Sequence, residues 1–218
     1  MQAQEIIQNI CIWALPVLFA ITLHEAAHGY VAHKLGDHTA YLLGRVSANP
    51  LKHIDPIGTI VIPLILMLTS PFIFGWAKPV PVDGRNLKNP RWDMAWVALA
   101  GPLSNFLMAL IWTGFLKLGL YLVQQKVVFG VPLALMGKAG LAINLVLMVL
   151  NLIPFPPLDG SRLLSAVLPQ RAAYRFNQIE RYGFLILLAL AVAGVLTKII
   201  VPPVQWLSLL ILNIFGIA

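Results

Sequence analysis

The sequence predicts an all-α fold, a polytopic integral membrane bundle of helices in which residues 1–218 form a single domain. Apolar residues make up 59% of the chain and charged residues 11%, whereas an average soluble domain has roughly 45–50% and about 25%. The apolar residues are gathered into blocks separated by short segments rich in proline, glycine and charge. This pattern is typical of a protein embedded in a lipid bilayer and excludes a disordered chain or an ordinary soluble enzyme.

The net charge of +7 comes from lysines and arginines that lie between the apolar blocks. Such an excess would suggest nucleic acid in a soluble chain, but between apolar blocks it is first a signal of membrane topology. We therefore expect a lipid bilayer and no nucleic acid among the partners. The one cysteine, Cys11, excludes an intramolecular disulfide framework.

Three apolar blocks are predicted to be the core helices. The first, residues 5–33, is longer than the roughly 30 Å core of a bilayer at about 1.5 Å per residue. No basic segment precedes it and no small-residue cleavage pattern follows it, so we expect a retained helix and not a signal peptide. The other two are residues 94–122 and residues 132–153, and the second of these must end at the prolines that begin with Pro154.

Two further apolar helices are expected near the C-terminus, residues 182–200 and residues 204–217, with Pro202 and Pro203 separating them. The last block is short for a full crossing. The sequence indicates neither the role of this pair nor the oligomeric state, and it contains no segment long enough for an accessory domain.

Residues 57–74 form another apolar block, but Gly58, Pro63 and Pro71 interrupt it. This composition is compatible with a re-entrant or shallow segment, provided that its non-helical backbone is buried in protein or lines a wet cavity. The prolines of the next segment, residues 75–82, favour short extended stretches of backbone there.

The sharpest chemical feature is the run HEAAH at residues 24–28, an HExxH motif. His24 and His28 are four residues apart and share one helix face, so both imidazoles can reach one metal ion. Glu25 then lies beside the metal, where a carboxylate can take a proton from water. The alternative is a polar cavity for ion passage, but three ionisable residues clustered in a membrane helix are costly and favour a metal site.

A third protein ligand is expected for zinc, and few acidic residues are available. Asp159 follows the prolines that end the 132–153 helix and precedes Gly160, which frees the backbone beside the carboxylate. This arrangement would fold an acid back against the bundle. Taken alone, however, the pattern is more typical of an interfacial turn with a capping aspartate.

Together these motifs resemble the site-2 protease family of intramembrane zinc metalloproteases. The resemblance rests on HEAAH in one apolar helix, GPLSN in a later one and NLIPFPPLDG after another. The stretches at residues 44–56 and 75–82 are similar to the compact bacterial branch, which has no appended PDZ or CBS domain. The resemblance covers about residues 20–165.

The resemblance implies a role for each motif residue. His24, His28 and Asp159 would bind zinc, the Zn²⁺ cofactor of the family. Glu25 would be the general base, and Asn151, eight residues before the aspartate, would bind substrate or stabilise the oxyanion. The implied activity is zinc-dependent hydrolysis of peptide bonds in or near transmembrane segments of membrane proteins.

Chain direction provides a check that does not depend on resemblance. His28 lies near the end of the first helix and Asp159 just after the end of the 132–153 helix, so both helices must cross the membrane in the same direction. The 94–122 helix supplies the one crossing needed between them, and residues 57–74 must then not span. With this topology 11 of the 15 lysines and arginines lie on the side of the metal, which the positive-inside rule makes cytoplasmic.

Substrate contacts are expected near the motif helices. A scissile peptide must be extended, and the prolines of residues 77–82 would let Val80 and Val82 present a backbone edge to an unwound transmembrane protein. The same segment is equally compatible with a plain connecting loop. Asn105 is predicted either to hydrogen-bond across helices near the site or to contact substrate.

The branch that the sequence resembles favours a bacterial plasma membrane, with the active site toward the cytoplasmic side. A competing function is a membrane metal-ion transporter or metal-binding protein that uses the same histidine and aspartate cluster. The two functions differ at Glu25, because a transporter would tolerate Glu25→Gln and a protease would not.

Overall fold

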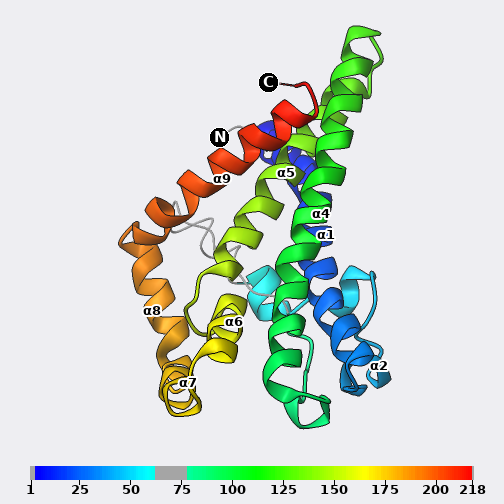
Figure 1. Cartoon of the computed structure of the whole chain (residues 1–218). Helices are drawn as coiled ribbons and strands as arrows, with labels where there is room; N and C mark the ends of the chain where they lie inside the picture. Colours follow the sequence, from blue (N-terminus) through cyan, green and yellow to red (C-terminus); the bar gives the residue numbers. More distant parts are fainter. Residues whose placement is uncertain (1–2, 62–77, 218) are drawn as a thin grey trace.

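The chain folds as a bundle of helices in the computed structural model, which describes residues 3–61 and 78–217 (Figure 1). No β-strand is found within these ranges, so the all-α prediction is confirmed for the described residues. The α-helices are α1 (Ala3–Lys34), α2 (Thr39–Leu42), α4 (Pro90–Gln124), α5 (Gly130–Leu152), α6 (Asp159–Val167), α7 (Gln170–Asn177), α8 (Glu180–Val192) and α9 (Val195–Ile214). Shorter turns of helix are η1 (Pro50–Lys52), η2 (Pro56–Val61) and η3 (Gly84–Asn86).

Four of these helices are long and apolar enough to cross a membrane. They are Ile7–Lys34 of α1, all of α4, all of α5 and all of α9. The three predicted core helices agree with α1, α4 and α5. Helices α1 and α4 extend one to four residues beyond their predicted bounds at both ends, whereas α5 starts two residues earlier and ends one residue earlier than predicted. The membrane character predicted from composition is therefore confirmed.

Helices α4 and α5 form an antiparallel hairpin at the centre of the bundle, and α1 packs against both (Figure 1). The hairpin is tight because small residues let the two backbones approach. A Cβ at Gly140 would lie 2.1 Å from Cγ of Trp112, and one at Gly137 would lie 2.4 Å from N of Leu116. Close packing through small residues is the usual way in which helices associate within a bilayer.

Helices α1 and α5 run in the same direction and α4 runs in the opposite one (Figure 1). The segment between α1 and α4 also leaves and returns at one end of the bundle, since the Lys88 N–H donates to the Leu35 carbonyl at 3.3 Å. These directions of α1, α4 and α5 are the ones that the parity of crossings required. The prediction for residues 57–74 falls largely on 62–77, which lie outside the described residues, so it stays a prediction.

The C-terminal helices differ from the prediction. A break was expected at Pro202 and Pro203, but α9 runs through both prolines and the break lies at Gly194. Gly194 has φ +71°, a left-handed conformation that glycine adopts without strain and that ends α8. The predicted helices 182–200 and 204–217 are thus corrected to Glu180–Val192 and Val195–Ile214.

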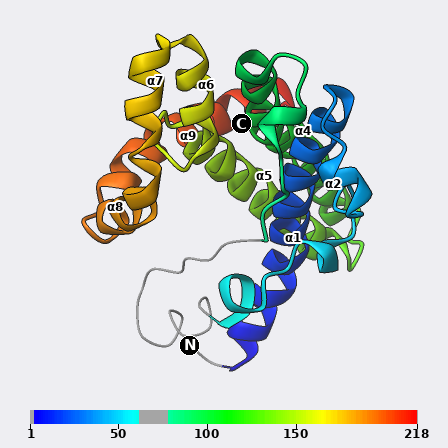
Figure 2. The same ribbon diagram turned by 90° about the horizontal axis from the view of Figure 1, so that it is seen from below.

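Helices α6 and α7 lie on one side of α4, and α2 lies on the other side beside the end of α1 (Figure 2). Residues 78–83, which we call the strap, form no helix and lead from the undescribed segment to η3. Four parts of the chain therefore lie at the same end of the bundle: the end of α1, the strap, the start of α4, and α6.

Candidate metal centre

Three side chains from two helices converge on one point. His24 Nε2 and His28 Nε2 on α1 are 3.0 Å apart, and Oδ2 of Asp159, the first residue of α6, lies 3.2 Å and 3.4 Å from them. Both histidines are buried, and the three residues form a group that could hold a metal ion. The structure thus brings together all three residues that were predicted as ligands.

The other ring nitrogen of each histidine is hydrogen-bonded to α4. His28 Nδ1 lies 2.7 Å from the Val97 carbonyl, and His24 Nδ1 lies 2.7 Å from Oδ1 of Asn105. A carbonyl oxygen only accepts, so Nδ1 carries the proton in each neutral ring and Nε2 keeps a lone pair. Asn105 is oriented with its oxygen toward His24 because its Nδ2 donates to the Ala20 carbonyl at 3.1 Å.

These protonation states leave two unprotonated nitrogens and one carboxylate oxygen facing one another. Their lone pairs repel unless a cation lies between them, and Oδ2 of Asp159 is buried without a hydrogen-bond partner. Tetrahedral zinc with bonds of about 2.0–2.1 Å separates its ligand atoms by roughly 3.3–3.4 Å. The separations of 3.0–3.4 Å and the donor set of two imidazoles and a carboxylate therefore fit a zinc ion.

Gly101 of α4 makes room for the two imidazoles. A Cβ at this position would lie 2.5 Å from Cε1 of His24 and 2.5 Å from Cε1 and Nε2 of His28. Such separations are far below any normal carbon contact, so a side chain at residue 101 would displace both rings. Gly101 belongs to the GPLSN motif, whose sequence alone does not predict this function.

Asp159 reaches the histidines because α6 starts directly against the end of α5. A Cβ at Gly160 would lie 2.4 Å from the Leu152 carbonyl oxygen and 2.5 Å from that of Ile153. A Cβ at residue 160 would clash with both carbonyl oxygens, so glycine is needed here for close approach. The predicted reason was different, because Gly160 lies inside α6 without a positive φ and supplies no special backbone freedom.

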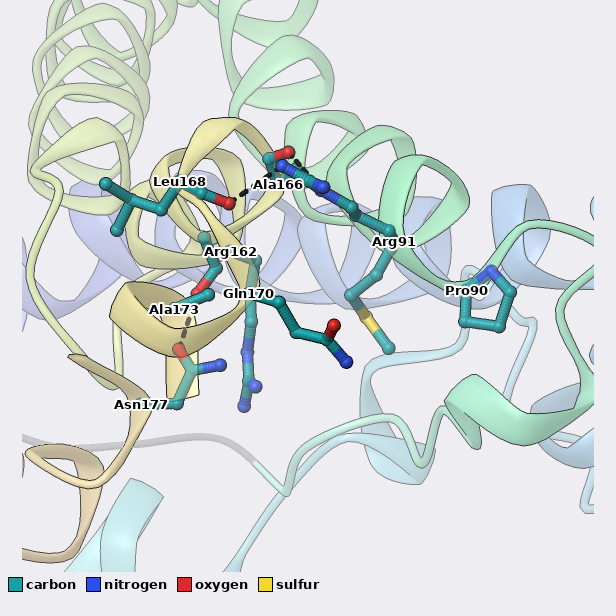
Figure 3. Close-up of a pocket in the computed structure, with 10 residues that line it drawn as sticks. Pro90, Arg91, Arg162, Ala166, Leu168, Gln170, Ala173 and Asn177 are labelled. Atoms are coloured by element: carbon teal, nitrogen blue, oxygen red, sulfur yellow. Dashed lines mark hydrogen bonds between the residues drawn. The ribbon is translucent and has the colours of Figure 1, made fainter. Parts of the chain in front are cut away.

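The other end of α6 is tied to α4 by one arginine (Figure 3). Arg91 donates from Nε to the Ala166 carbonyl at 2.5 Å and from Nη2 to the Leu168 carbonyl at 2.8 Å. These carbonyls lie at the C-terminal end of α6, where helix carbonyls lack partners within the helix. Arg91 thus fixes the helix that carries Asp159, and a cavity of about 420 Å³ opens beside this contact without touching the metal ligands.

Glu25 is partly buried, and its carboxylate is not free. Oε2 accepts a hydrogen bond from the backbone N–H of Val80 in the strap at 2.9 Å. Val80 itself is 9% exposed. The structure therefore places Val80 beside the motif glutamate. Its N–H, which was predicted to pair with an extended substrate, is hydrogen-bonded to Glu25 instead.

Asn105 and Asn151, the two asparagines predicted to take part in the site, have different surroundings. Asn105 is fully buried, and its amide is used by His24, Ala20 and Asn144, so of its two predicted roles the structure shows the cross-helix hydrogen bond and not an exposed substrate contact. Asn151 lies near the end of α5, and its Nδ2 donates to the Leu147 carbonyl at 3.0 Å in its own helix.

Two residues that support the metal-binding histidines, one on α4 and one on α5, were not predicted from the sequence. Val97 acts through a backbone carbonyl, which no side-chain pattern reveals. Asn144, which accepts from Asn105 at 3.0 Å, is a buried amide in an apolar helix. An amide in a membrane-spanning segment is itself a signal of function and could have identified Asn144.

A second polar cluster joins the end of α1 to the strap through Asp37. Its Oδ2 accepts the Asp83 N–H at 2.7 Å, and its Oδ1 accepts Asn86 Nδ2 at 3.0 Å and the Thr39 hydroxyl at 2.5 Å. Burial raises the pKa of the Asp37 carboxyl, but the hydrogen bonds from Thr39 and Asn86 outweigh it and lower the pKa below its ordinary value. The charged form of Asp37 thus stabilises this end of the bundle.

Known proteins provide an independent comparison. The profile of Peptidase family M50 matches residues 123–194. The chain is 40% identical over 191 residues to the Bacillus subtilis protein named "Putative zinc metalloprotease YwhC", a match that covers 86% of this chain and 83% of that protein.

More distant relatives carry the same kind of name. The chain is 26% identical over 190 residues to "Putative zinc metalloprotease Rip2" of Mycolicibacterium smegmatis and 27% identical over 199 residues to the protein of that name in Mycobacterium tuberculosis. Each match covers 87% of this chain and 70% of the relative. No solved structure matches the chain.

Proposed function

Because this chain belongs to Peptidase family M50 and is a zinc metalloprotease, we propose that it hydrolyses peptide bonds in or near transmembrane segments of other membrane proteins. One observation carries the proposal, the depth of the metal ligands in the bundle. His24 lies ten residues before Lys34, the end of the candidate span that starts at Ile7, which is about 15 Å along the helix. A zinc site at that depth lies beside segments that a soluble protease does not reach.

In this proposal His24, His28 and Asp159 hold the zinc ion. The ion, when bound, supplies a Lewis acid that makes a water molecule easier to deprotonate. Glu25 accepts the proton from that water and passes it to the amine of the leaving peptide. Asn151 binds the substrate or donates to its developing oxyanion, for which its amide must turn from the Leu147 carbonyl.

The substrate is proposed to be an unwound segment that lies along the strap. The Val80 amide is occupied by Glu25, but the Val82 N–H has no hydrogen bond in the described part of the chain. The Val80 carbonyl and the Val82 N–H therefore remain for pairing with an extended peptide. This edge would select substrates whose helices unwind easily, because the carbonyls of an intact helix are engaged in their own hydrogen bonds.

The whole chain, residues 1–218, is proposed to be one membrane-embedded catalytic domain in a bacterial plasma membrane. The end of the bundle that holds Asp37, the start of α4 and α7 carries most of the lysines and arginines. By the positive-inside rule this end faces the cytoplasm, and the N-terminus of α1 lies on the other side.

The experiment that tests this function is co-expression of the chain with a panel of tagged single-span membrane proteins, in parallel with its Glu25→Gln variant. Loss of the new fragments in the variant, with zinc still bound after purification, is the expected result. Fragments of equal amount with both proteins would contradict the proposal. Zinc transport that survives Glu25→Gln, with no fragments in either case, would support a metal-ion transporter instead.

A further inference from the structure

The strap offers a single amide donor where it crosses α1, and that donor reaches Glu25. Pro79 and Pro81 have no backbone N–H, so Val80 provides the one amide hydrogen between Lys78 and Val82. This hydrogen is donated to Oε2 of Glu25 at 2.9 Å. The sequence KPVPV therefore removes the neighbouring donors and keeps the one that meets the motif glutamate.

The strap is fixed on both sides of Val80. On one side, Arg45 Nη2 donates to the Lys78 carbonyl at 2.9 Å and to the Pro79 carbonyl at 3.3 Å. The Lys78 N–H donates to the His53 carbonyl at 2.9 Å. On the other side, the Asp83 N–H donates to Asp37, as described above. A backbone held at both ends cannot move its amide away from Glu25 without breaking these bonds.

The Val80 side chain packs directly on α1 as well. Gly29 lies one helical turn after Glu25 on the same face, and a Cβ at Gly29 would lie 3.0 Å from Cγ1 of Val80. The absence of a side chain at residue 29 thus lets the strap approach α1 at the height where its amide reaches the carboxylate.

We propose that the strap is a positioning element for Glu25, in which the Val80 amide holds the carboxylate in the orientation needed for proton transfer. This inference rests on the proposed function in taking Glu25 as the proton acceptor. A glutamate side chain has three rotatable bonds and would otherwise sample several orientations in a wet cavity. One hydrogen bond to Oε2 fixes the carboxylate and leaves Oε1 to face the reacting water, an arrangement that matters because small misplacements of reacting groups cost rate.

Arg45 is the second positioning residue in this proposal, since it acts on Glu25 through the strap. Its guanidinium donates to the two carbonyls that precede Val80 and, within the described residues, forms no hydrogen bond or ion pair with Glu25 or the metal ligands. The same residue therefore gives a way to loosen the strap without changing Val80.

The first test is a thermodynamic cycle that needs no substrate. Melting temperatures would be measured for the zinc-loaded full chain with Val80→Pro, which removes the N–H, with Glu25→Ala, and with both. If the two groups interact, the shift caused by Val80→Pro is at most half as large in the Glu25→Ala background. Val80→Ala keeps the N–H, so its shift should be the same in both backgrounds. Equal shifts for Val80→Pro in the two backgrounds would overturn the proposed contact.

The second test separates positioning from substrate binding by kinetics. With a single-span fusion that the wild type cleaves, Val80→Pro should lower kcat by about 10-fold to 100-fold and leave KM within about twofold. The fold-decrease in kcat caused by Val80→Ala should be at least ten times smaller than that caused by Val80→Pro. Val82→Pro, which removes the free N–H proposed to pair with substrate, should instead raise KM. A rise in KM with unchanged kcat for Val80→Pro would overturn the positioning role.

Arg45→Gln provides the second route if Val80→Pro does not fold. Arg45→Gln should also lower kcat, with zinc content unchanged, and Arg45→Lys, which keeps a cationic donor group, should recover part of the loss. An unchanged kcat in Arg45→Gln would contradict the role of the strap. If no fusion is cleaved by the wild type, the proposed function fails, and the thermodynamic cycle alone decides whether the strap amide holds Glu25.

Discussion

Asn105 on α4 accepts a hydrogen bond from His24 Nδ1 on α1 at 2.7 Å, and both side chains are buried. The amide of Asn105 is itself held, because its Nδ2 donates to Asn144 Oδ1 at 3.0 Å, and Asn144 Nδ2 donates to the Gly140 carbonyl at 2.8 Å. This chain of buried amides fixes both the ring orientation and the tautomer of His24. A hydrogen bond to the ring nitrogen that does not bind the metal orients the histidine and raises its affinity for the ion.

The first prediction concerns this relationship. Asn105→Leu has a similar volume but removes the acceptor for His24 Nδ1, so zinc affinity should fall about 10-fold to 100-fold. Competition with a chelator on the purified protein in detergent would measure this. Ser104→Ala is the matched control, because Ser104 Oγ donates only to the Gly101 carbonyl of its own helix, and its zinc affinity should stay within about twofold of wild type. Wild-type affinity in Asn105→Leu would contradict the account.

The second prediction concerns the space at Gly101. Gly101→Ala would place a Cβ 2.5 Å from both imidazoles, so the purified variant should contain little zinc and have no proteolytic activity. Gly114→Ala, in the same helix, meets only Cε1 of Phe215 at 4.0 Å and should keep both properties. Metal content per chain would be measured for the two variants together. Full zinc occupancy in Gly101→Ala would show that the rings have more room than the structure gives them.

The parts of the site that were predictable from sequence are those encoded by local spacing. His24, Glu25 and His28 follow from the period of one helix, and the blocks that became α1, α4 and α5 follow from apolar length. The contacts made by Asn105, Gly101 and Val97 depend on how α4 docks on α1, which local sequence does not specify.

In α9, a local sequence rule predicted a helix break that the structure does not have. Pro202 and Pro203 each lack an N–H and would break most helices in water, yet they lie inside α9. In membrane helices prolines are tolerated, and a glycine with positive φ, Gly194, is the stronger signal for where a helix stops. A local rule derived from soluble proteins therefore placed the boundary at the wrong residue.

The third prediction tests how α6 is held. Arg91→Gln removes the two hydrogen bonds to Ala166 and Leu168 carbonyls, so the free energy of unfolding should fall by about 1–3 kcal/mol. Zinc affinity should fall several-fold as well, because α6 carries Asp159. Thermal unfolding in detergent, with and without added zinc, would measure both effects. Arg171→Gln on the exposed face of α7 serves as the control, and equal behaviour of the two variants would refute the role given to Arg91.

The fourth prediction concerns the pH dependence of stability at the Asp37 cluster. The pKa of Asp37 is lowered in the folded chain, so its contribution to stability is complete above its ordinary pKa of 3.8 and is lost as the pH falls through the folded value. Asp37→Asn should therefore be less stable than wild type by about 1–3 kcal/mol at neutral pH.

The difference between the two proteins should narrow below about pH 4, because protonated Asp37 loses the advantage that its charge gives. Melting temperatures measured across this range would show it. Asp83, whose pKa the Arg85 guanidinium lowers to about 2, titrates in both proteins and so does not affect the difference. A constant difference from pH 7 to pH 3 would contradict the assignment.

The most direct measurement is cleavage by the purified enzyme in liposomes that contain one single-span substrate. Mass spectrometry of the fragments should locate one cut inside or at the edge of the apolar segment, and the two fragment masses should add up to that of the substrate plus one water. Cleavage should be absent with Glu25→Gln, even though that variant retains zinc. Fragments that end only in loops outside the bilayer, or the same fragments from Glu25→Gln, would contradict an intramembrane zinc protease built on His24, His28 and Asp159.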